Sequence, residues 1–296
     1  MERPYVGSGG AAASADVDSG YPATVNADSA GATPPELDTG VPHPARVYDA
    51  LLGGKDNFAA DRQVADAIRV SPAGEIAPVA NRDFLRRVVT FLSTEAGIDQ
   101  FLDVGTGLPT APNVHEVAQA LNPAARIVYV DNDPIVLVHA RALLVSASDG
   151  VTSYVDADIR DPETILAHAR ETLDFSRPVG LLLLAIGHFL DDEDDAYGVV
   201  GRLVDALPSG SYLAMSHLTG EFQPEDTKKT EAMYRAQGMK LRSRTKDEFT
   251  RFFDGLELVE PGVTLTHLWH PDAQDRIPVD TPGEHSPGYS AVGRKA

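Results

Sequence analysis

The stretch Gln100-Phe101-Leu102-Asp103-Val104-Gly105-Thr106-Gly107 indicates a buried strand that runs directly into a glycine-rich turn. Gly105 and Gly107 let the backbone turn tightly and approach a ligand closely, because neither carries a Cβ atom. A second apolar strand follows at 125–130 and leads into Asp131-Asn132-Asp133. A carboxylate at the tip of the second strand, one β–α–β unit after a glycine turn, is the arrangement that holds a nucleoside ribose. The sequence therefore predicts a nucleoside-binding site here.

Strand and helix patterns alternate along the rest of the chain. We expect further strands at 152–155, 179–186 and 211–216, each followed by a helical segment. The strand at 179–186 is almost wholly apolar, as is typical of a central parallel strand. Repeated β–α units predict an α/β fold with a doubly wound, mostly parallel, Rossmann-like sheet. Strand-like segments at 256–260, 263–268 and 289–293 predict a C-terminal antiparallel hairpin.

Three regions differ in composition and pattern. Residues 1–40 are rich in Ala, Gly, Ser and Pro and predict a disordered tail. Residues 41–97 predict an N-terminal helical cap, in which Pro72 and Gly74 interrupt the helical pattern before a helix from about 79 to 95. Residues 98–296 then form the cofactor-binding domain, with a helical insertion at about 222–254 that helps to cover the pocket.

Composition narrows the function further. The formal net charge is −19, which argues against nucleic acid as the main partner and favours a small molecule. The chain has no cysteine, so thiol catalysis and cysteine metal sites are excluded. The apolar runs are too short to span a membrane and no signal peptide is visible, so a cytoplasmic location is expected. We expect no metal site, since the acidic run 191–195 is typical of a solvated helix entry. Nothing in the sequence indicates an oligomeric state.

The D-x-G-x-G turn that begins at Asp103, with acidic turns at Asp131 and Asp158, resembles class I S-adenosylmethionine-dependent methyltransferases. The resemblance implies that Gly105-Thr106-Gly107 approaches the amino-acid end of the cofactor. It also implies that Asp131, with Asn132 beside it, binds the ribose. Asp158 and Ile159 would frame the adenine, although Asp158 is also a candidate helix cap. Asp103 would orient the glycine turn or bind the cofactor amine through water.

Further blocks resemble one actinobacterial family of S-adenosyl methyltransferases, formerly a domain of unknown function. They are Ala45-Arg46-Val47-Tyr48-Asp49 with 52–57, Asn81 to Arg87, Gln100 to Thr110, 113–116 and 129–134. The resemblance runs from about Pro42 to Lys295. It implies S-adenosylmethionine as cofactor and methyl transfer to a small-molecule acceptor, whose identity it does not supply. Arg46 and Lys55 are candidates to pair with the cofactor carboxylate, and an ordinary surface position explains them equally well.

His188 and His217 follow the fourth and fifth strands, at the edge where ligands bind in such sheets. Either is a candidate general base if the acceptor is a protonated oxygen or nitrogen. A structural role is the alternative for each. Two other functions stay open: a binding protein that has lost catalysis, and a nicotinamide-dependent oxidoreductase. The missing third glycine and the terminal hairpin count against the oxidoreductase.

Overall fold

Among the residues that the structure describes, the sheet is mixed, with five strands in parallel pairing followed by three in antiparallel pairing. The structure is a computed structural model that describes residues 38–136, 138 and 149–296. Among these residues the strand order is β3-β2-β1-β4-β5-β8-β6, and β7 also pairs with β8. The parallel strands are β1 (Gln100–Val104), β2 (Arg126–Asp131), β3 (Val151–Asp156), β4 (Gly180–Leu184) and β5 (Tyr212–Leu218). The predicted doubly wound α/β fold is confirmed.

The C-terminal strands extend the sheet beyond β5 and are antiparallel to their neighbours. β8 (Gly288–Lys295) lies between β5 and β6 (Leu256–Leu258) and runs antiparallel to both. β7 (Thr264–Leu265) pairs with the beginning of β8. The predicted antiparallel ending is therefore confirmed, although the expected strand at 263–268 is only two residues long before a 3₁₀ turn at Thr266–Leu268.

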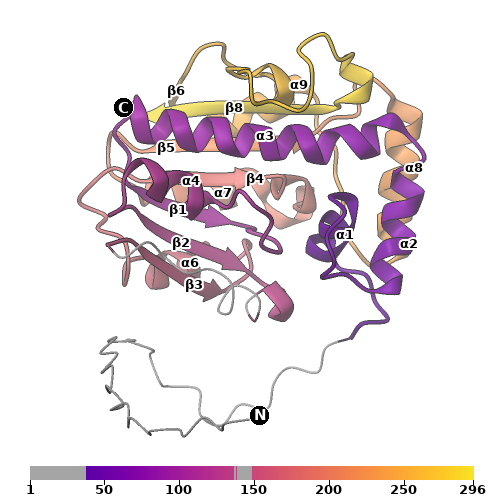
Figure 1. Cartoon of the computed structure of the whole chain (residues 1–296), viewed down its shortest axis with the longest axis horizontal. Coiled ribbons are helices and arrows are strands. Elements are labelled where there is room, and N and C mark those ends of the chain that lie inside the picture. Colours follow the sequence, from indigo (N-terminus) through magenta and orange to yellow (C-terminus); the bar gives the residue numbers. More distant parts are fainter. Residues whose placement is uncertain (1–37, 137, 139–148) are drawn as a thin grey trace, which may run out of the picture. The chain divides into compact units, whose positions relative to one another are not determined.

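Both faces of the sheet are covered, because alternate residues of each buried strand point to opposite sides. Phe101 packs with α3 (Pro72–Thr94) and α4 (Val114–Leu121) on one face. Leu102 packs with α6 (Pro162–Ala169), α7 (Ala196–Asp205) and α9 (Lys246–Thr250) on the other. This alternation explains why β1 and β4 are buried along their whole length. Figure 1 shows α3 running across the sheet.

The predicted break between two helices near Pro72 is confirmed, but the next helix was expected from about 79, whereas α3 is one helix of 23 residues that begins at Pro72. Ser71 is the N-cap, and its Oγ accepts a hydrogen bond from the backbone N–H of Gly74 at 3.3 Å. Proline fits the first helical position because its missing N–H would have no partner there. Gly74 lets this turn pass close to Ile68, whose backbone would overlap a Cβ atom at position 74. The later turns of α3 pack on the sheet, where Phe84, Val88 and Leu92 share a cluster with Phe101.

The helices that cover the strand ends come from two distant parts of the chain. α1 (Pro44–Leu51) and α2 (Ala59–Ile68) pack against α8 (Pro224–Ala236), which belongs to the expected insertion. Val47 and Val64 share one apolar cluster with Tyr234 and Leu241. In Figure 1 these three helices stand beyond the arrowheads of the parallel strands. The covering layer is thus built from α1, α2 and α8.

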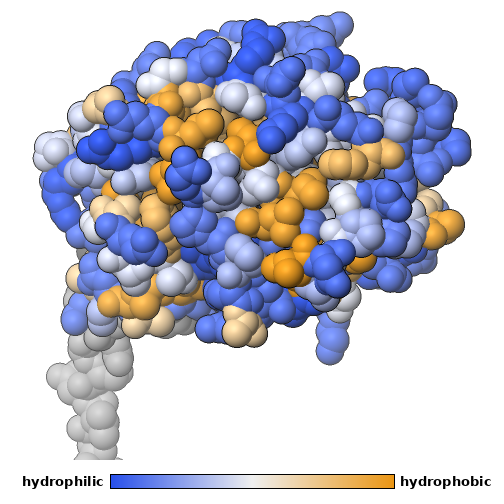
Figure 2. Space-filling model, turned by 90° about the horizontal axis from the view of Figure 1, so that it is seen from above, coloured by the Kyte–Doolittle hydropathy of each residue, from blue (hydrophilic) through white to orange (hydrophobic). Residues whose placement is uncertain are grey.

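The remaining predictions concern the ends and the surface of the chain. The predicted tail at 1–40 lies almost entirely outside the described residues, as does most of the helix that starts at Pro134. Within the described part of the chain, no helix combines the length and apolar character needed to cross a membrane. On the face drawn in Figure 2, apolar side chains form small patches that hydrophilic residues separate.

Candidate functional site

A crevice of about 480 Å³ opens at the carboxyl ends of β1 and β4. The strand order reverses between these two strands, since the chain passes from β1 outward to β2 and β3 and then returns to β4. Such a switch point is where open α/β sheets bind ligands. Eight of the predicted site residues line the crevice together: Asp103, Gly105, Thr106, Gly107, Asp131, Asn132, Asp158 and Ile159.

Asp131 joins the tip of β2 to the glycine turn after β1. Its Oδ2 accepts a hydrogen bond from the backbone N–H of Gly107 at 2.8 Å, and its Oδ1 accepts one from Asp133 N–H at 3.0 Å. Each carboxylate oxygen keeps a further lone pair for a ligand in the crevice. Burial raises the pKa of Asp131, and these backbone N–H groups oppose the rise. The carboxylate is therefore held in place and still able to accept hydrogen bonds.

Gly105 is required by the backbone and by its surroundings. Its φ of +77° lies in the left-handed region that favours glycine. A Cβ atom there would lie 2.5 Å from Cγ1 of Ile186, which follows β4. The turn after β1 is thus pressed against the segment after β4, and this contact narrows the crevice between them.

Asp103 has a buried carboxyl group that lines the crevice. Its side chain is 5% exposed, and no hydrogen bond to it is found among the described residues. Burial raises its pKa to about 7, and the negative charge of Asp131 adds to the rise while Arg82 opposes it. An unpaired buried carboxyl group is costly. A ligand ammonium group in the crevice would supply the missing partner.

At the end of the crevice formed by the loops after β2 and β3, the polar and charged side chains are paired with one another. Asn132 Nδ2 donates to Asp158 Oδ2 at 2.9 Å, and the Arg160 guanidinium donates to both oxygens of Asp158 at 2.8 and 2.7 Å. These hydrogen bonds outweigh the effect of partial burial and lower the pKa of Asp158. Lys240, from the loop after α8, also lines this end and pairs with Asp194 at 2.8 Å. The loop after α8 therefore contacts the turn at Asp192–Asp194, which follows β4 and whose Asp194 carboxylate also lies 3.9 Å from the Arg160 guanidinium of the loop after β3.

Arg46 and Lys55 do not line the crevice. Arg46 is only 5% exposed and pairs instead with Asp61 at 3.7 Å and Asp133 at 3.4 Å. A buried guanidinium needs a negatively charged partner, and Asp133 supplies one. This ion pair anchors α1 to the segment after β2. Lys55 is exposed in the turn between α1 and α2.

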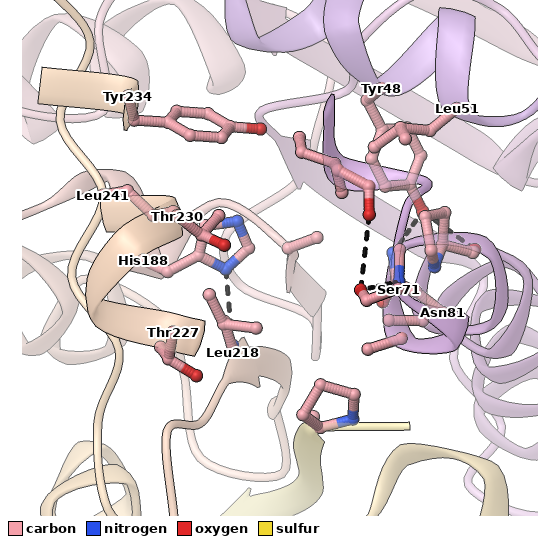
Figure 3. A pocket seen from close by; sticks show the side chains of 18 of the residues that line it. Tyr48, Leu51, Ser71, Asn81, His188, Leu218, Thr227, Thr230, Tyr234 and Leu241 are labelled. Carbon is pink, nitrogen blue, oxygen red and sulfur yellow. Dashed lines mark hydrogen bonds between the residues drawn. The ribbon is translucent and has the colours of Figure 1, made fainter. Parts of the chain in front are cut away.

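A second cavity of about 630 Å³ adjoins the crevice under α1, α2 and α8. Five residues line both spaces: Pro44, Tyr48, Asn81, Ala185 and Phe189. Figure 3 shows side chains from the covering helices and from the sheet facing this cavity. A molecule in the second cavity would therefore lie next to a molecule in the crevice.

A hydrogen-bonded chain fixes the wall between the two spaces. Asn81 Nδ2 donates to Tyr48 Oη at 2.9 Å, and the Ser216 hydroxyl donates to Asn81 Oδ1 at 2.5 Å. The backbone N–H of Ala185 donates to Ser216 Oγ at 2.9 Å. Ala185 has a φ of +56°, a strained value for a residue with a Cβ atom. The four residues come from α1, α3, β5 and the end of β4, so the wall depends on all four being in place.

His217 lines the second cavity, and both of its ring nitrogens are occupied. Nδ1 lies 2.7 Å from the carbonyl of Leu218, and Nε2 lies 2.9 Å from Nη1 of Arg244. A carbonyl can only accept and a guanidinium can only donate, so Nδ1 carries the proton and Nε2 accepts. Burial, His188 and Arg244 together lower the pKa of His217. The ring is neutral and has no free lone pair to take a proton.

His188 lines the second cavity, and its imidazole ring has one hydrogen bond among the described residues. The backbone N–H of Leu218 donates to its Nδ1 at 3.4 Å. Burial and the positive charge of Arg244 lower the pKa of His188 to about 3. The structure thus brings both predicted histidines to the sheet edge but in settings that disfavour their charged forms.

Several residues of the site were not predicted, including Asn81, Arg82, Arg160 and Lys240. Asn81 and Arg82 left one signal, because polar residues interrupt the apolar pattern of α3 where the helix is buried. Arg82 donates to the carbonyls of Thr110 and Pro112 and so fixes the loop before α4. The other two depend on contacts between distant loops, which local sequence does not reveal.

A model of the S-adenosyl methyltransferase family matches residues 30–296. The chain belongs to this family. Two solved structures are similar to the methyltransferase. A DUF574 family protein from Streptomyces avermitilis is 51% identical, with a TM-score of 0.84 over 88% of this chain and 99% of that chain. A candidate methyltransferase from Thermobifida fusca is 47% identical, with a TM-score of 0.79 over 88% of this chain and 98% of that chain. No curated protein matches.

Family membership decides between the functions that the sequence left open. The methyltransferase uses S-adenosylmethionine, and the expected family and cofactor are confirmed. Nothing in the comparisons supports an oxidoreductase or a binding protein without catalysis. The crevice fits this cofactor, because it offers an anchored carboxylate at Asp131 and an unpaired buried carboxyl group at Asp103.

Replacing Gly105 tests the close contact between the two loops. We expect Gly105→Ala to destabilise the methyltransferase by several kcal/mol, because strain and overlap with Ile186 add together. Gly97→Ala is the matched control, since Gly97 also has a positive φ of +68° but nothing within 4 Å of the added Cβ. It should cost about 1 kcal/mol. Urea unfolding measures both, and equal losses would contradict the contact.

Asp103 should make the cofactor-free protein less stable as pH rises. Its pKa of about 7 in the fold lies above the ordinary value of 3.8, so the folded state holds a proton that the unfolded chain has already lost. Its contribution is complete below pH 4 and disappears as pH rises to 7, by about 4 kcal/mol at most. Asp103→Asn has no proton to lose between pH 4 and pH 7. Its free energy of unfolding should therefore rise relative to that of the unsubstituted protein as pH increases over this range.

Urea unfolding from pH 4 to pH 8 measures this difference. Asp205→Asn, at an exposed carboxylate, is the control and should show a much smaller change, because water solvates that group in both states. A difference between Asp103→Asn and the unsubstituted protein that stays constant with pH would mean that Asp103 is not buried unpaired.

Proposed function

We propose that this methyltransferase transfers a methyl group from S-adenosylmethionine in the crevice to a small molecule in the second cavity. The observation that carries the proposal is the shared wall, in which residues such as Tyr48, Asn81 and Ala185 line both spaces. Two reactants held on either side of one narrow boundary gain much of the entropy advantage that catalysis needs. The second cavity is therefore the acceptor site of the proposal.

The carboxylates of Asp131 and Asp103 are proposed to bind different groups of the cofactor. Asp131 is proposed to accept hydrogen bonds from the ribose hydroxyls, since two backbone N–H groups already fix its orientation. Asp103 is proposed to pair with the ammonium group of the methionine moiety, which is the partner that its buried carboxyl group lacks. Gly105, Thr106 and Gly107 let the backbone approach this moiety closely.

The adenine end is proposed to lie between the loop after β3 and the loop after α8. Ile159 supplies an apolar surface there, and Asn132 lies beside Asp158. The Asp158 carboxylate is largely engaged by Arg160, so its main contribution is to hold this loop in position. Met239, from the loop after α8, lines the same part of the crevice.

The cofactor supplies a sulfonium-bound methyl group that is already electrophilic. The acceptor lone pair forms the new bond to the methyl carbon, and the carbon–sulfur bond breaks with its electron pair remaining on sulfur. A proton on the acceptor, where there is one, passes to water. The chain's own part is to align the acceptor through the shared wall and to exclude bulk water with α1, α2 and α8.

Neither histidine is proposed as the general base. His217 has no free lone pair, because Leu218 and Arg244 engage both of its nitrogens. His188 stays neutral, and its Nδ1 is directed at the Leu218 N–H group. Positioning and desolvation then carry the proposed reaction, which suits an electrophile that needs no activation by the protein.

Calorimetric titration with S-adenosylhomocysteine tests the crevice. The protein should bind S-adenosylhomocysteine and not NAD. We expect Asp131→Asn to weaken binding about 10- to 100-fold, because hydrogen bonds to a charged acceptor contribute about 1.5–3 kcal/mol. Asp161→Asn is the control, since Asp161 caps α6 three residues after Asp158 and does not line the crevice. Unchanged affinity in Asp131→Asn would remove the proposed ribose contact.

A further inference from the structure

We propose that the second cavity binds an uncharged, largely apolar acceptor, and that the Nε2–H group of His188 donates a hydrogen bond to an oxygen or nitrogen of that acceptor. This inference rests on the proposed methyl transfer and specifies the chemistry of its acceptor. His188 is then a residue that positions and selects the acceptor, in place of the general base that its location suggests.

The position of the proton on His188 follows from its contact with the main chain. The backbone N–H of Leu218 can only donate, so Nδ1, at 3.4 Å, must be the unprotonated nitrogen. The neutral ring therefore carries its proton on Nε2. Burial and Arg244 keep the pKa of His188 at about 3, so the ring stays neutral near pH 7.

The Nε2–H group is available to a ligand. Within the described part of the chain the Leu218 contact is the hydrogen bond of the His188 ring, so Nε2 is left as a donor beside the cavity. Figure 3 shows one ring nitrogen directed at Leu218 and the other on the opposite edge of the ring, on the side where Tyr234 lies. A buried donor without a partner gains a full hydrogen bond when a ligand supplies an acceptor.

The charges around the cavity disfavour an ionised acceptor. Among the residues that line it, Asp226 and Lys229 are the ones with full charges, and both are exposed on α8. They neutralise each other, since Lys229 Nζ donates to Asp226 Oδ1 at 2.8 Å. An ion inside the cavity would lose its hydration without meeting an unpaired opposite charge among the lining residues, which is costly. The lining therefore selects for an uncharged molecule.

The rest of the lining is mainly apolar, with hydroxyl groups such as those of Thr230 and Tyr234 among the apolar side chains. Leu51, Phe189, Leu218 and Leu241 contribute apolar side chains from both the covering helices and the sheet edge. The Tyr234 hydroxyl extends into the same space (Figure 3), and burial raises its pKa so that it stays protonated. A volume of about 630 Å³ suits an organic molecule of one to three rings.

Four related probes test the inference on the full chain saturated with S-adenosylhomocysteine. They are naphthalene, 2-acetylnaphthalene, 2-naphthoate and 2-naphthylmethylammonium, which share one ring system and differ in polarity and charge. We expect 2-acetylnaphthalene to bind about tenfold more tightly than naphthalene, because its carbonyl accepts one net hydrogen bond. Both ions should bind more weakly than the ketone. Fluorescence or calorimetric titration gives the four dissociation constants.

Substitution of His188 then assigns the preference to this residue. In His188→Leu the tenfold preference for the ketone should vanish, while naphthalene still binds. His188→Gln, which keeps an N–H donor, should retain part of the preference. The affinity of each variant for S-adenosylhomocysteine is the control, because His188 does not line the crevice and an intact fold should leave that affinity unchanged.

The outcomes separate this inference from the function on which it rests. If the unsubstituted protein fails to bind S-adenosylhomocysteine, the proposed methyl transfer fails and the inference fails with it. If S-adenosylhomocysteine binds but no probe does, or an ion binds more tightly than the ketone, the inference alone is overturned. A preference for the ketone that survives in His188→Leu would also overturn it. Even if a variant does not fold, the ranking of the four dissociation constants in the unsubstituted protein tests whether the cavity prefers an uncharged hydrogen-bond acceptor.

Discussion

The hydrogen bonds of the Asp131 carboxylate hold the site together. One joins the tip of β2 to the turn after β1, and the other fixes the residues that follow β2. Because β1 and β2 are parallel neighbours in register, their ends arrive at the same level and a single side chain can bridge them. The crevice exists because this bridge and the close contact between Gly105 and Ile186 set the distances among three loops.

The second cavity depends on a different kind of constraint. Its wall is a short chain of hydrogen bonds through Tyr48, Asn81, Ser216 and the strained backbone of Ala185. Its roof is an apolar cluster between α1, α2 and α8. A buried ion pair between Arg46 and Asp133 ties this roof to the end of β2. The crevice and the second cavity are thus structurally connected, since the same segment after β2 supports both.

Much of the crevice could be predicted from sequence because its residues are local. The apolar strand before Gly105 and the acidic residues at the tip of β2 lie in short segments whose patterns have a direct structural meaning. The start of α3 was mistaken because Pro72 and Gly74 are typical of a break, and their actual roles depend on the N-cap at Ser71 and the approach of Ile68. The sequence did not reveal the pairing of Arg46 with Asp133, because the two residues are remote in sequence. The sequence predicted that helical segments at 41–97 and 222–254 cover the pocket, but the lining of the second cavity depends on how these remote helices pack together, which local sequence does not reveal.

A crystal structure of the methyltransferase with S-adenosylhomocysteine tests the account most directly. The account predicts ribose hydroxyls within hydrogen-bond distance of Asp131, the ammonium group beside Asp103, and sulfur at the wall that Asn81 and Ala185 share between the two spaces. An adenosine bound elsewhere, or a sulfur atom separated from the second cavity by the protein's own side chains, would contradict it.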